Sequence, residues 1–144
     1  MSILLPYNPG LLPNKPAPKP EESILIKVAG LPPVKDIKLS IRNKKHKFHQ
    51  RFTSLRNSAT KTMDGRAWTF DEVDINLVIR SPEKPTIQGH SEFLGGIFDT
   101  LDGSSGFTFT YLPIVFEDDS QVSSCNLNWE RSYESSYSVH IIFK

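Results

Sequence analysis

The sequence predicts a small α+β domain in which a mixed β-sheet packs against two helices. Three observations carry this prediction. The chain has 144 residues, which is the size of one domain. Two segments repeat apolar residues at helical spacing, and short β-branched segments alternate with them in the order β, α, β, α, β, β, β. The composition is that of an ordinary globular protein, with 38% hydrophobic and 23% charged residues.

The first 22 residues are predicted to form an extended tail outside a domain at residues 23–144. Six of the 11 prolines lie in this stretch, and each fixes φ and lacks an amide donor, so neither a helix nor a central strand can form there. The first strand follows at residues 24–28, which are rich in β-branched side chains. It ends at Gly30, before the pair Pro32-Pro33.

Helical and strand periods then alternate along the chain. Apolar residues at steps of three and four predict a helix at residues 48–63, and a period of two predicts a strand at 73–80. A second helix is predicted at 92–101, with Ser91 as its N-cap. It contains Gly95-Gly96, a costly pair in a helix, which suggests that another segment approaches its backbone closely. Further strands are predicted at 107–116, 122–129 and 137–143.

The near-neutral net charge of +1 hides two oppositely charged halves. Residues 1–66 contain 13 basic and 4 acidic side chains, a formal charge of +9, and residues 67–144 contain 4 basic and 12 acidic ones, a formal charge of −8. The single cysteine, Cys125, excludes a scaffold held by intramolecular disulfides. Since no apolar run is long enough to span a bilayer and the first residues do not read as a signal peptide, we expect a cytoplasmic protein without a membrane partner.

Eight of the 17 basic residues lie between residues 35 and 56, where a single acidic residue, Asp36, opposes them. Clustered lysine and arginine side chains bind nucleic acids by neutralising phosphates and releasing counterions. A solvated basic helix face and a surface for an acidic protein are the alternative interpretations. The residues predicted to contact DNA are Lys35, Lys38, Arg42, Lys44, Lys45, Lys47, Arg51 and Arg56.

Three consecutive acids, Glu117, Asp118 and Asp119, lie between apolar segments. In extended chain, Glu117 and Asp119 would point to the same side and could hold a divalent cation through their oxygen atoms. Asp99, near the end of the second predicted helix, could join such a cluster. A solvated turn is the alternative interpretation of the three acids.

Several motifs together resemble the RusA family of Holliday junction resolvases over about residues 24–143. The motifs are Ile24-x-Ile26-x-x-x-Gly30-x-Pro32-Pro33-x-Lys35, Leu55-Arg56-x-x-Ala59, Ile97-Phe98-Asp99-Thr100-Leu101-Asp102-Gly103 and Asp118-Asp119-Ser120-Gln121-Val122. The resemblance implies a small α+β homodimer that binds four-way DNA junctions and cuts them with magnesium held by aspartates. It thereby implies a role in DNA recombination and repair.

The chain also departs from the catalytic pattern of this family. Of the metal-binding aspartates, Asp119 is present, but the other two positions fall on Gly89 and Ser91. The family's asparagine falls on Glu92 and its lysine on Gly95. Glycine and serine supply no anionic oxygen for a two-metal cleavage, and Gly95 supplies no cation for the developing charge.

The leading hypothesis is therefore a RusA-like protein that binds branched DNA and has lost or weakened magnesium-dependent cleavage. A second hypothesis keeps an active junction endonuclease, with a rearranged catalytic site of Asp119, Asp118 and Glu92. In that case Asp119 and Asp99 would hold Mg²⁺, and His90 could be a further ligand or acid. A third hypothesis is a protein-interaction module without DNA binding, whose basic half meets an acidic partner or the acidic half of another copy.

Overall fold

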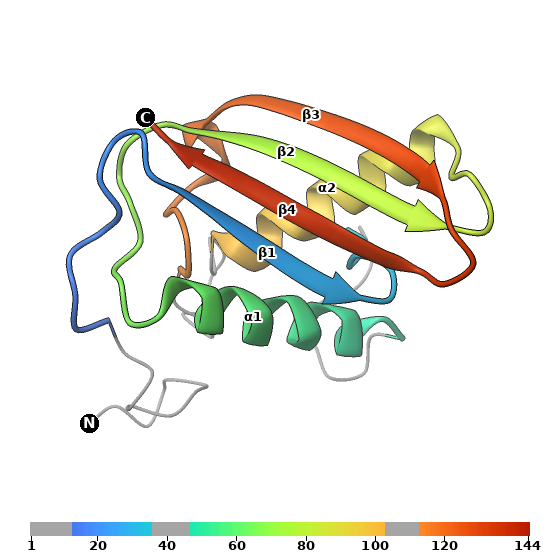
Figure 1. Ribbon diagram of the computed structural model, residues 1–144, viewed down its shortest axis with the longest axis horizontal. Helices are drawn as coiled ribbons and strands as arrows, with labels where there is room; N and C mark the ends of the chain where they lie inside the picture. The colour runs from blue at the N-terminus through green and yellow to red at the C-terminus, as the bar shows by residue number, and fades with distance from the viewer. Residues whose placement is uncertain (1–12, 36–46, 103–112) are drawn as a thin grey trace.

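The computed structural model describes residues 13–35, 47–102 and 113–144. Within them, four strands form one mixed sheet, and Figure 1 shows helices α1 and α2 against one side of it. This arrangement confirms the predicted α+β fold class. The elements are β1 (Ser23–Ala29), α1 (His49–Met63), β2 (Val73–Ser81), α2 (Ile87–Leu101), the 3-10 turn η3 (Asp119–Gln121), β3 (Val122–Arg131) and β4 (Ser136–Phe143).

The strand order in the sheet is β1-β4-β2-β3. The last strand, β4, lies between β1 and β2 and is antiparallel to both, with Ile141 opposite Ile24 on one side and Ile75 on the other. β3 runs parallel to β2, with Leu127 opposite Leu77. The sheet is therefore mixed, as predicted, and the C-terminal segment completes it at its centre.

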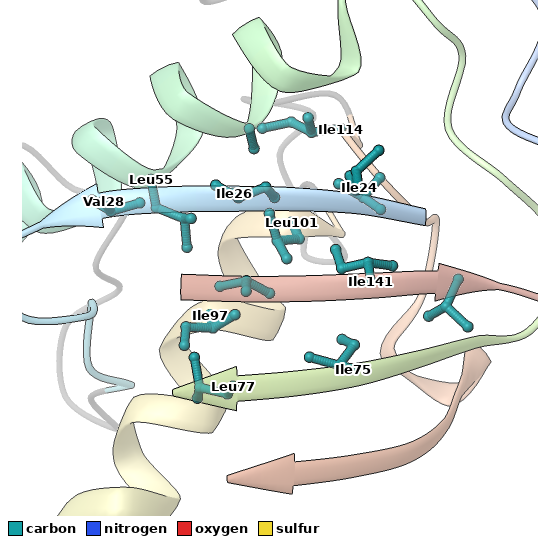
Figure 2. Close-up of a cluster of buried hydrophobic side chains, with 14 of the residues drawn as sticks. Ile24, Ile26, Val28, Leu55, Ile75, Leu77, Ile97, Leu101, Ile114 and Ile141 are labelled. Atoms are coloured by element: carbon teal, nitrogen blue, oxygen red, sulfur yellow. The ribbon is translucent and has the colours of Figure 1, made fainter. Parts of the chain in front are cut away.

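The predicted strand alternation separates a buried face from a solvent-facing one. Along β1, β2 and β4 every second residue is buried, and these residues form one core with the apolar faces of α1 and α2. Figure 2 shows part of this core, with Ile26, Ile75 and Ile141 pointing from the sheet toward the helices. The opposite face carries polar pairs between β2 and β3, including a hydrogen bond of 3.1 Å between the Asn76 and Asn126 side chains. One apolar face per sheet explains why both helices lie on the same side.

Helix α1 confirms the predicted helix at 48–63 to within one residue. Phe52, Leu55, Ala59 and Met63 are buried against the sheet, as their spacing predicts. The helix ends where Asp64 adopts a left-handed conformation, with φ of 51°. The turn that follows leads the chain back toward β2.

Helix α2 begins earlier than predicted. Its first residue is Ile87, and its N-cap is Thr86, whose hydroxyl accepts a hydrogen bond of 3.0 Å from the Gly89 amide. The prediction of Ser91 as N-cap is therefore wrong, because the polar residues Gln88 to Ser91 form the exposed first turn of the helix rather than the loop before it.

The expected close approach to Gly95-Gly96 is confirmed. The segment from Pro33 to Lys35 crosses α2 at these two glycines, and the Lys35 amide donates a hydrogen bond of 3.1 Å to the Glu92 carbonyl oxygen. A Cβ on Gly96 would occupy the space of the Pro33 carbonyl group. The connection after β1 is thereby fixed on the helix that covers the sheet.

The described part of the proline-rich stretch, residues 13–22, is extended along the domain. The Asn14 and Lys15 amides donate to the Gly65 carbonyl oxygen, and Pro18 is buried. Near the start of β1, the Glu21 amide donates to the Phe143 carbonyl oxygen at 2.6 Å. Both ends of the described stretch therefore contact the domain, and the predicted boundary after residue 22 stays a prediction.

The strand predicted at 107–116 lies partly outside the described residues. Its described end, 113–116, is not a strand of the sheet but makes one isolated bridge, between Phe116 and Thr69. Ile114 and Val115 donate their amides to the Leu101 carbonyl oxygen and so close the end of α2. Among the described helices, none combines the length and the apolar character needed to cross a membrane.

Candidate functional site

The basic residues predicted to contact DNA fall into three groups. Lys35 and Lys47 are exposed, Arg51 is half-buried and Arg56 is buried. Lys38, Arg42, Lys44 and Lys45 lie outside the described residues. Along the sequence, the exposed residues Lys35 and Lys47 therefore flank the segment with the other four predicted contacts. Lys35 packs against α2, and Lys47 lies just before the start of α1.

The N-terminus of α1 gathers positive charge. Phe48 is the N-cap residue, and because it has no polar side chain, the helix has no side-chain cap. The first turn contains no acidic residue. The dipole of a helix N-terminus favours an anion at this position. The described charged side chains at this end, Lys47 and Arg51, are both cations, so neither supplies the negative charge that the dipole favours.

Both cations are held on the ring of Phe48. The Arg51 guanidinium carbon lies 3.8 Å from the ring centroid and the Lys47 ammonium nitrogen 5.1 Å from it. Such cation–π contacts fix the direction of side chains that would otherwise be mobile. Phe48 therefore positions two positive charges beside the helix N-terminus.

Arg51 is also partly withdrawn from water. Burial lowers its pKa from the ordinary value, and the hydroxyl of Tyr137 acts in the opposite direction. Its guanidinium donates a long hydrogen bond of 3.5 Å to the Pro32 carbonyl oxygen. Among the described residues it has no carboxylate partner. Of its five donors, one makes this bond to a described residue.

These residues line a groove between the end of β1 and the start of α1, which we call the Arg51 groove. It has a volume of about 440 Å³, and none of the described residues that line it is acidic. Gly30, at the end of β1, adopts φ of +88°, and a Cβ built on it would meet no atom within 4 Å. The lining includes Gly30, Lys47, Phe48, Arg51, Ser54 and Ser135.

Arg56 lies apart from this surface. Only 8% of the residue is exposed, and its guanidinium lies 5.9 Å from the ring centroid of Phe52. Arg56 is therefore far less exposed than Lys35 and Lys47, and its contact with DNA stays a prediction.

The acidic candidates Asp118 and Asp119 lie in an exposed turn before β3. Gln121 holds this turn: its side-chain oxygen accepts hydrogen bonds from the Glu117 and Asp118 amides at 2.8 and 2.9 Å. Its side-chain nitrogen donates to the Thr69 and Asp71 carbonyl oxygens at 2.9 and 2.8 Å. The segment is therefore a fixed turn, not the extended chain in which Glu117 and Asp119 would share a side.

The remaining acidic candidates lie on α2. Glu92 is exposed and Asp99 is half-buried, and seven residues of helix separate them by about 10 Å. Within the described residues, no three histidine, cysteine, aspartate or glutamate side chains lie close enough together to hold a metal ion. Asp118, Asp119, Glu92 and Asp99 are thus not gathered into one cluster. Their catalytic and metal-binding roles, and the use of Mg²⁺, stay predictions.

The RusA resemblance implies a lysine at the position of Gly95. In the structure, the side chain of another lysine, Lys35, lies directly over this glycine. Its Cβ and Cδ would each be 3.0 Å from a Cβ at position 95. A lysine from the crossing segment thus occupies the surface that a residue 95 side chain would cover. At Gly89, one of the family's aspartate positions, the atoms nearest to a Cβ belong to Thr86 and Pro85.

The sequence indicated Lys47 and Arg51 but not the groups around them. Tyr137 lies 86 positions after Arg51 and gave no signal beyond its place in an alternating strand. Its hydroxyl is buried and has no hydrogen-bond partner among the described residues. Burial raises its pKa, and Arg51 opposes this rise.

No family model matches the chain, and no curated protein sequence matches it either. The RusA resemblance therefore rests on the quoted motifs.

Proposed function

We propose that this protein binds nucleic acid, in particular branched DNA, through the basic surface around the N-terminus of α1, and that it does so without efficient magnesium-dependent cleavage. The observation that carries the proposal is the pairing of Lys47 and Arg51 on the Phe48 ring, beside a helix N-terminus without a cap. Lys35 extends the basic surface toward α2.

The proposal is supported by the lack of carboxylate partners for Lys35, Lys47 and Arg51 among the described residues. Several described basic residues elsewhere are neutralised by carboxylates, as in the pairs Arg80–Glu130 at 2.8 Å and Lys15–Asp64 at 3.3 Å. Lys35, Lys47 and Arg51 have no such partner among the described residues. Unpaired cations bind polyanions more strongly, because no internal ion pair has to be broken first.

The dispersal of the acidic candidates supports the second part of the proposal. Cleavage of a phosphodiester by two metal ions needs carboxylates that hold the ions about 4 Å apart. Asp119 and Glu92 come from an exposed turn and from the second turn of α2, and no group of three ligands gathers around either within the described residues. We therefore expect binding to persist where cleavage does not.

Binding is tested by electrophoretic mobility of a synthetic four-way junction and a duplex of equal length at several salt concentrations. If about four to six phosphates are contacted, log K should fall with log salt at a slope of about −4 to −5. The absence of any shift with the junction at low salt would contradict the proposal and favour the protein-interaction module. Equal affinity for junction and duplex would contradict the preference for branched DNA.

A matched pair of variants locates the interface. Lys35→Gln/Lys47→Gln and Lys61→Gln/Lys84→Gln remove the same charge from exposed lysines. Lys61 lies at the opposite end of α1, about 21 Å from Lys47 along the helix. The first variant should flatten the salt slope by about 2, and the second should change it little. Equal effects would mean that net charge, not this surface, determines binding.

One observation favours the alternative of an active endonuclease: Lys35 lies over Gly95 and could offer a cation where the resemblance places one. The test is nicking of the same junction in magnesium or manganese, by the wild type and by Asp119→Asn. Nicking that disappears in Asp119→Asn would establish the enzyme. Binding without nicking at micromolar protein would reject it.

A further inference from the structure

The turn between β3 and β4 presents one aromatic side chain to solvent. Tyr133, in this turn, is 95% exposed, more than any other exposed large hydrophobic residue of the described structure. Its ring therefore adds almost nothing to the core, and burial does not explain an aromatic residue at this position. Because the fold does not use this ring, its faces are available to a partner.

The turn is fixed to the sheet on both sides of Tyr133. The Ser132 amide donates a hydrogen bond of 3.1 Å to the Ser81 carbonyl oxygen, at the end of β2. The Gly30 amide, just after β1, donates a hydrogen bond of 2.9 Å to the Ser135 carbonyl oxygen. Tyr133 is therefore presented on a fixed support, and since its side chain has only two torsions, ordering it on binding costs little conformational entropy.

The turn also lies beside the basic surface of the candidate site. Ser135 lines the Arg51 groove together with Lys47 and Arg51, and Figure 1 shows the turn at the end of the sheet where α1 begins. Two residues of chain span at most about 7 Å, which is about two steps of 3.4 Å along a DNA strand. A strand whose phosphates lie on the groove can therefore place a base on the Tyr133 ring.

A further cation precedes Tyr133. Arg131 is exposed, and its guanidinium carbon lies 5.2 Å from the ring centroid of Trp129. It also donates a hydrogen bond of 2.6 Å to the Pro82 carbonyl oxygen, which fixes its direction. Along the chain, Tyr133 is thus flanked by Arg131 and by Ser135, which borders the cations of the groove. Proteins hold single-stranded nucleic acid with this combination, in which cations contact the phosphates and bases stack on an aromatic ring.

We propose that Tyr133 stacks on an unpaired DNA base, while Arg131 and the Arg51 groove hold the phosphates on either side of it. This inference rests on the proposed nucleic-acid function and deepens it, because it gives a physical source for a preference for branched DNA. Bases inside a duplex arm are stacked on both faces, whereas an unpaired base has a face free for the ring. The exposed acid Glu134 follows Tyr133, so the turn contributes stacking rather than positive charge.

The test compares the affinity of the full chain for a four-way junction, a duplex of equal length and the same duplex with a short bulge of unpaired thymines. Tyr133→Ala should weaken binding of the bulged duplex about tenfold, as expected for the loss of one stacked base, and binding of the plain duplex less than twofold. The slope of log K against log salt should not change, because no charge is removed. Equal losses on the bulged and plain duplexes would overturn the proposal.

Two further substitutions at the same position separate stacking from apolar bulk. Tyr133→Phe keeps the ring and should bind the bulged duplex within about twofold of the wild type, whereas Tyr133→Leu lacks a π-face and should lose nearly as much affinity as Tyr133→Ala. A leucine variant that binds like the wild type would overturn the proposal, as would a phenylalanine variant that binds like Tyr133→Ala.

Phe70 provides a matched control. It is also an exposed aromatic residue, 70% exposed, but it lies just before β2 begins at Val73, whereas the turn with Tyr133 is fixed to the end of β2 at Ser81. Nine residues of strand separate the two ends by about 30 Å. Phe70→Ala should therefore change the affinity for the bulged duplex less than twofold. A loss equal to that of Tyr133→Ala would overturn the proposal.

A photochemical crosslink reports the contact directly. With 5-iodouracil at the unpaired position of the bulged duplex, irradiation joins this base to an aromatic side chain that it stacks on. We expect the crosslinked peptide to contain Tyr133, and the crosslink to persist in Tyr133→Phe and to vanish in Tyr133→Ala. A crosslink of the wild type at a different aromatic residue would overturn the proposal.

The outcomes separate this inference from the proposed function. Salt-dependent junction binding that is unchanged in Tyr133→Ala would overturn the inference and leave the proposed function in place. No binding of any of the three DNA molecules by the wild type would overturn both.

Discussion

The carbonyl group of Pro33 lies in the space that a Cβ on Gly96 would occupy. This contact joins the segment after β1 to the middle of α2, and the hydrogen bond from the Lys35 amide to the Glu92 carbonyl oxygen extends it. It also places Lys35 on the surface of α2, at one side of the proposed interface. The glycine pair in α2 is therefore a packing requirement, and its cost in helix propensity is offset by the close crossing.

Gly96→Ala should destabilise the fold. The new methyl group meets backbone atoms of Pro33 and Val34, which cannot move aside like a side chain. Overpacking of this kind costs about 1–3 kcal/mol, more than the roughly 1 kcal/mol that alanine gains in helix propensity. Urea unfolding measures the difference.

Gly95→Ala is the control, because the methyl group there meets only the flexible Lys35 side chain at 3.0 Å. It should be neutral or slightly stabilising. A Gly96→Ala variant as stable as Gly95→Ala would contradict the crossing.

Tyr137→Phe should stabilise the unliganded protein. The hydroxyl is buried and has no described partner, so its removal relieves a desolvation cost of about 1 kcal/mol. Thr100→Val is the control: Thr100 is also fully buried, but its hydroxyl donates to the Gly96 carbonyl oxygen at 2.7 Å. Its removal should lower the free energy of unfolding by about 1 kcal/mol. A loss of stability in Tyr137→Phe would show that the hydroxyl has a partner.

Gln121→Leu should loosen the acidic turn. The substitution removes the acceptor of the Glu117 and Asp118 amides and the donor to two carbonyl oxygens. Since the turn is exposed and water replaces part of these bonds, we expect a loss of about 1–3 kcal/mol. Hydrogen exchange at the Glu117 and Asp118 amides should speed up. The exposed Ser123→Ala serves as the control, and unchanged exchange in Gln121→Leu would mean that the turn holds by itself.

Cys125 should react slowly in the native protein. Burial raises its pKa, so the thiolate fraction at pH 7.5 is smaller than in the unfolded chain. Because it is the single cysteine, alkylation by iodoacetamide reports on this site alone. The rate should be several times lower than in urea, and its rise with pH should be shifted upward. A native rate at pH 7.5 equal to the unfolded one would contradict the shift.

The same pKa shift has a consequence for stability. The folded state holds the Cys125 proton more tightly than the unfolded state does, so this group favours folding below its ordinary pKa. The contribution is lost as the pH rises through the raised folded pKa. Cys125→Ser should therefore flatten the decline of stability on the alkaline side. An unchanged decline in this variant would assign it to other groups.

Local patterns determined most of the secondary structure. The period of two along residues 73–80 and the helical face from Phe52 to Met63 each place apolar side chains on one side, and burial of that side is the dominant favourable term in folding. The same reasoning failed at the start of α2, where Thr86, not Ser91, is the cap. The sequence prediction considered Ser91 alone, because the first turn of α2 is exposed and carries no apolar period that would have marked an earlier start.

The residues of the candidate site likewise divide into those that the sequence could predict and those that it could not. The sequence identified Lys47 and Arg51 as basic residues at the start of a helix, and it could have placed Arg56, four residues after Phe52, on the buried face. It could not show that Tyr137 lies near enough to Arg51 for each group to affect the pKa of the other. That neighbourhood depends on β4 lying between β1 and β2, and strand order is set by packing of the whole sheet rather than by any local period.

The sequence by itself thus determined the fold class, most of the helices and strands, and the supply of positive charge. The tertiary structure decided how these charges are placed: it buried Arg56 and held Lys47 and Arg51 on Phe48, and within the described residues it brought no three metal-binding side chains together. The physical reason is that the hydrophobic period of a sequence reports only on residues within one or two turns of each other along the chain. The groups that neutralise, desolvate or orient a charge come from segments tens of residues away.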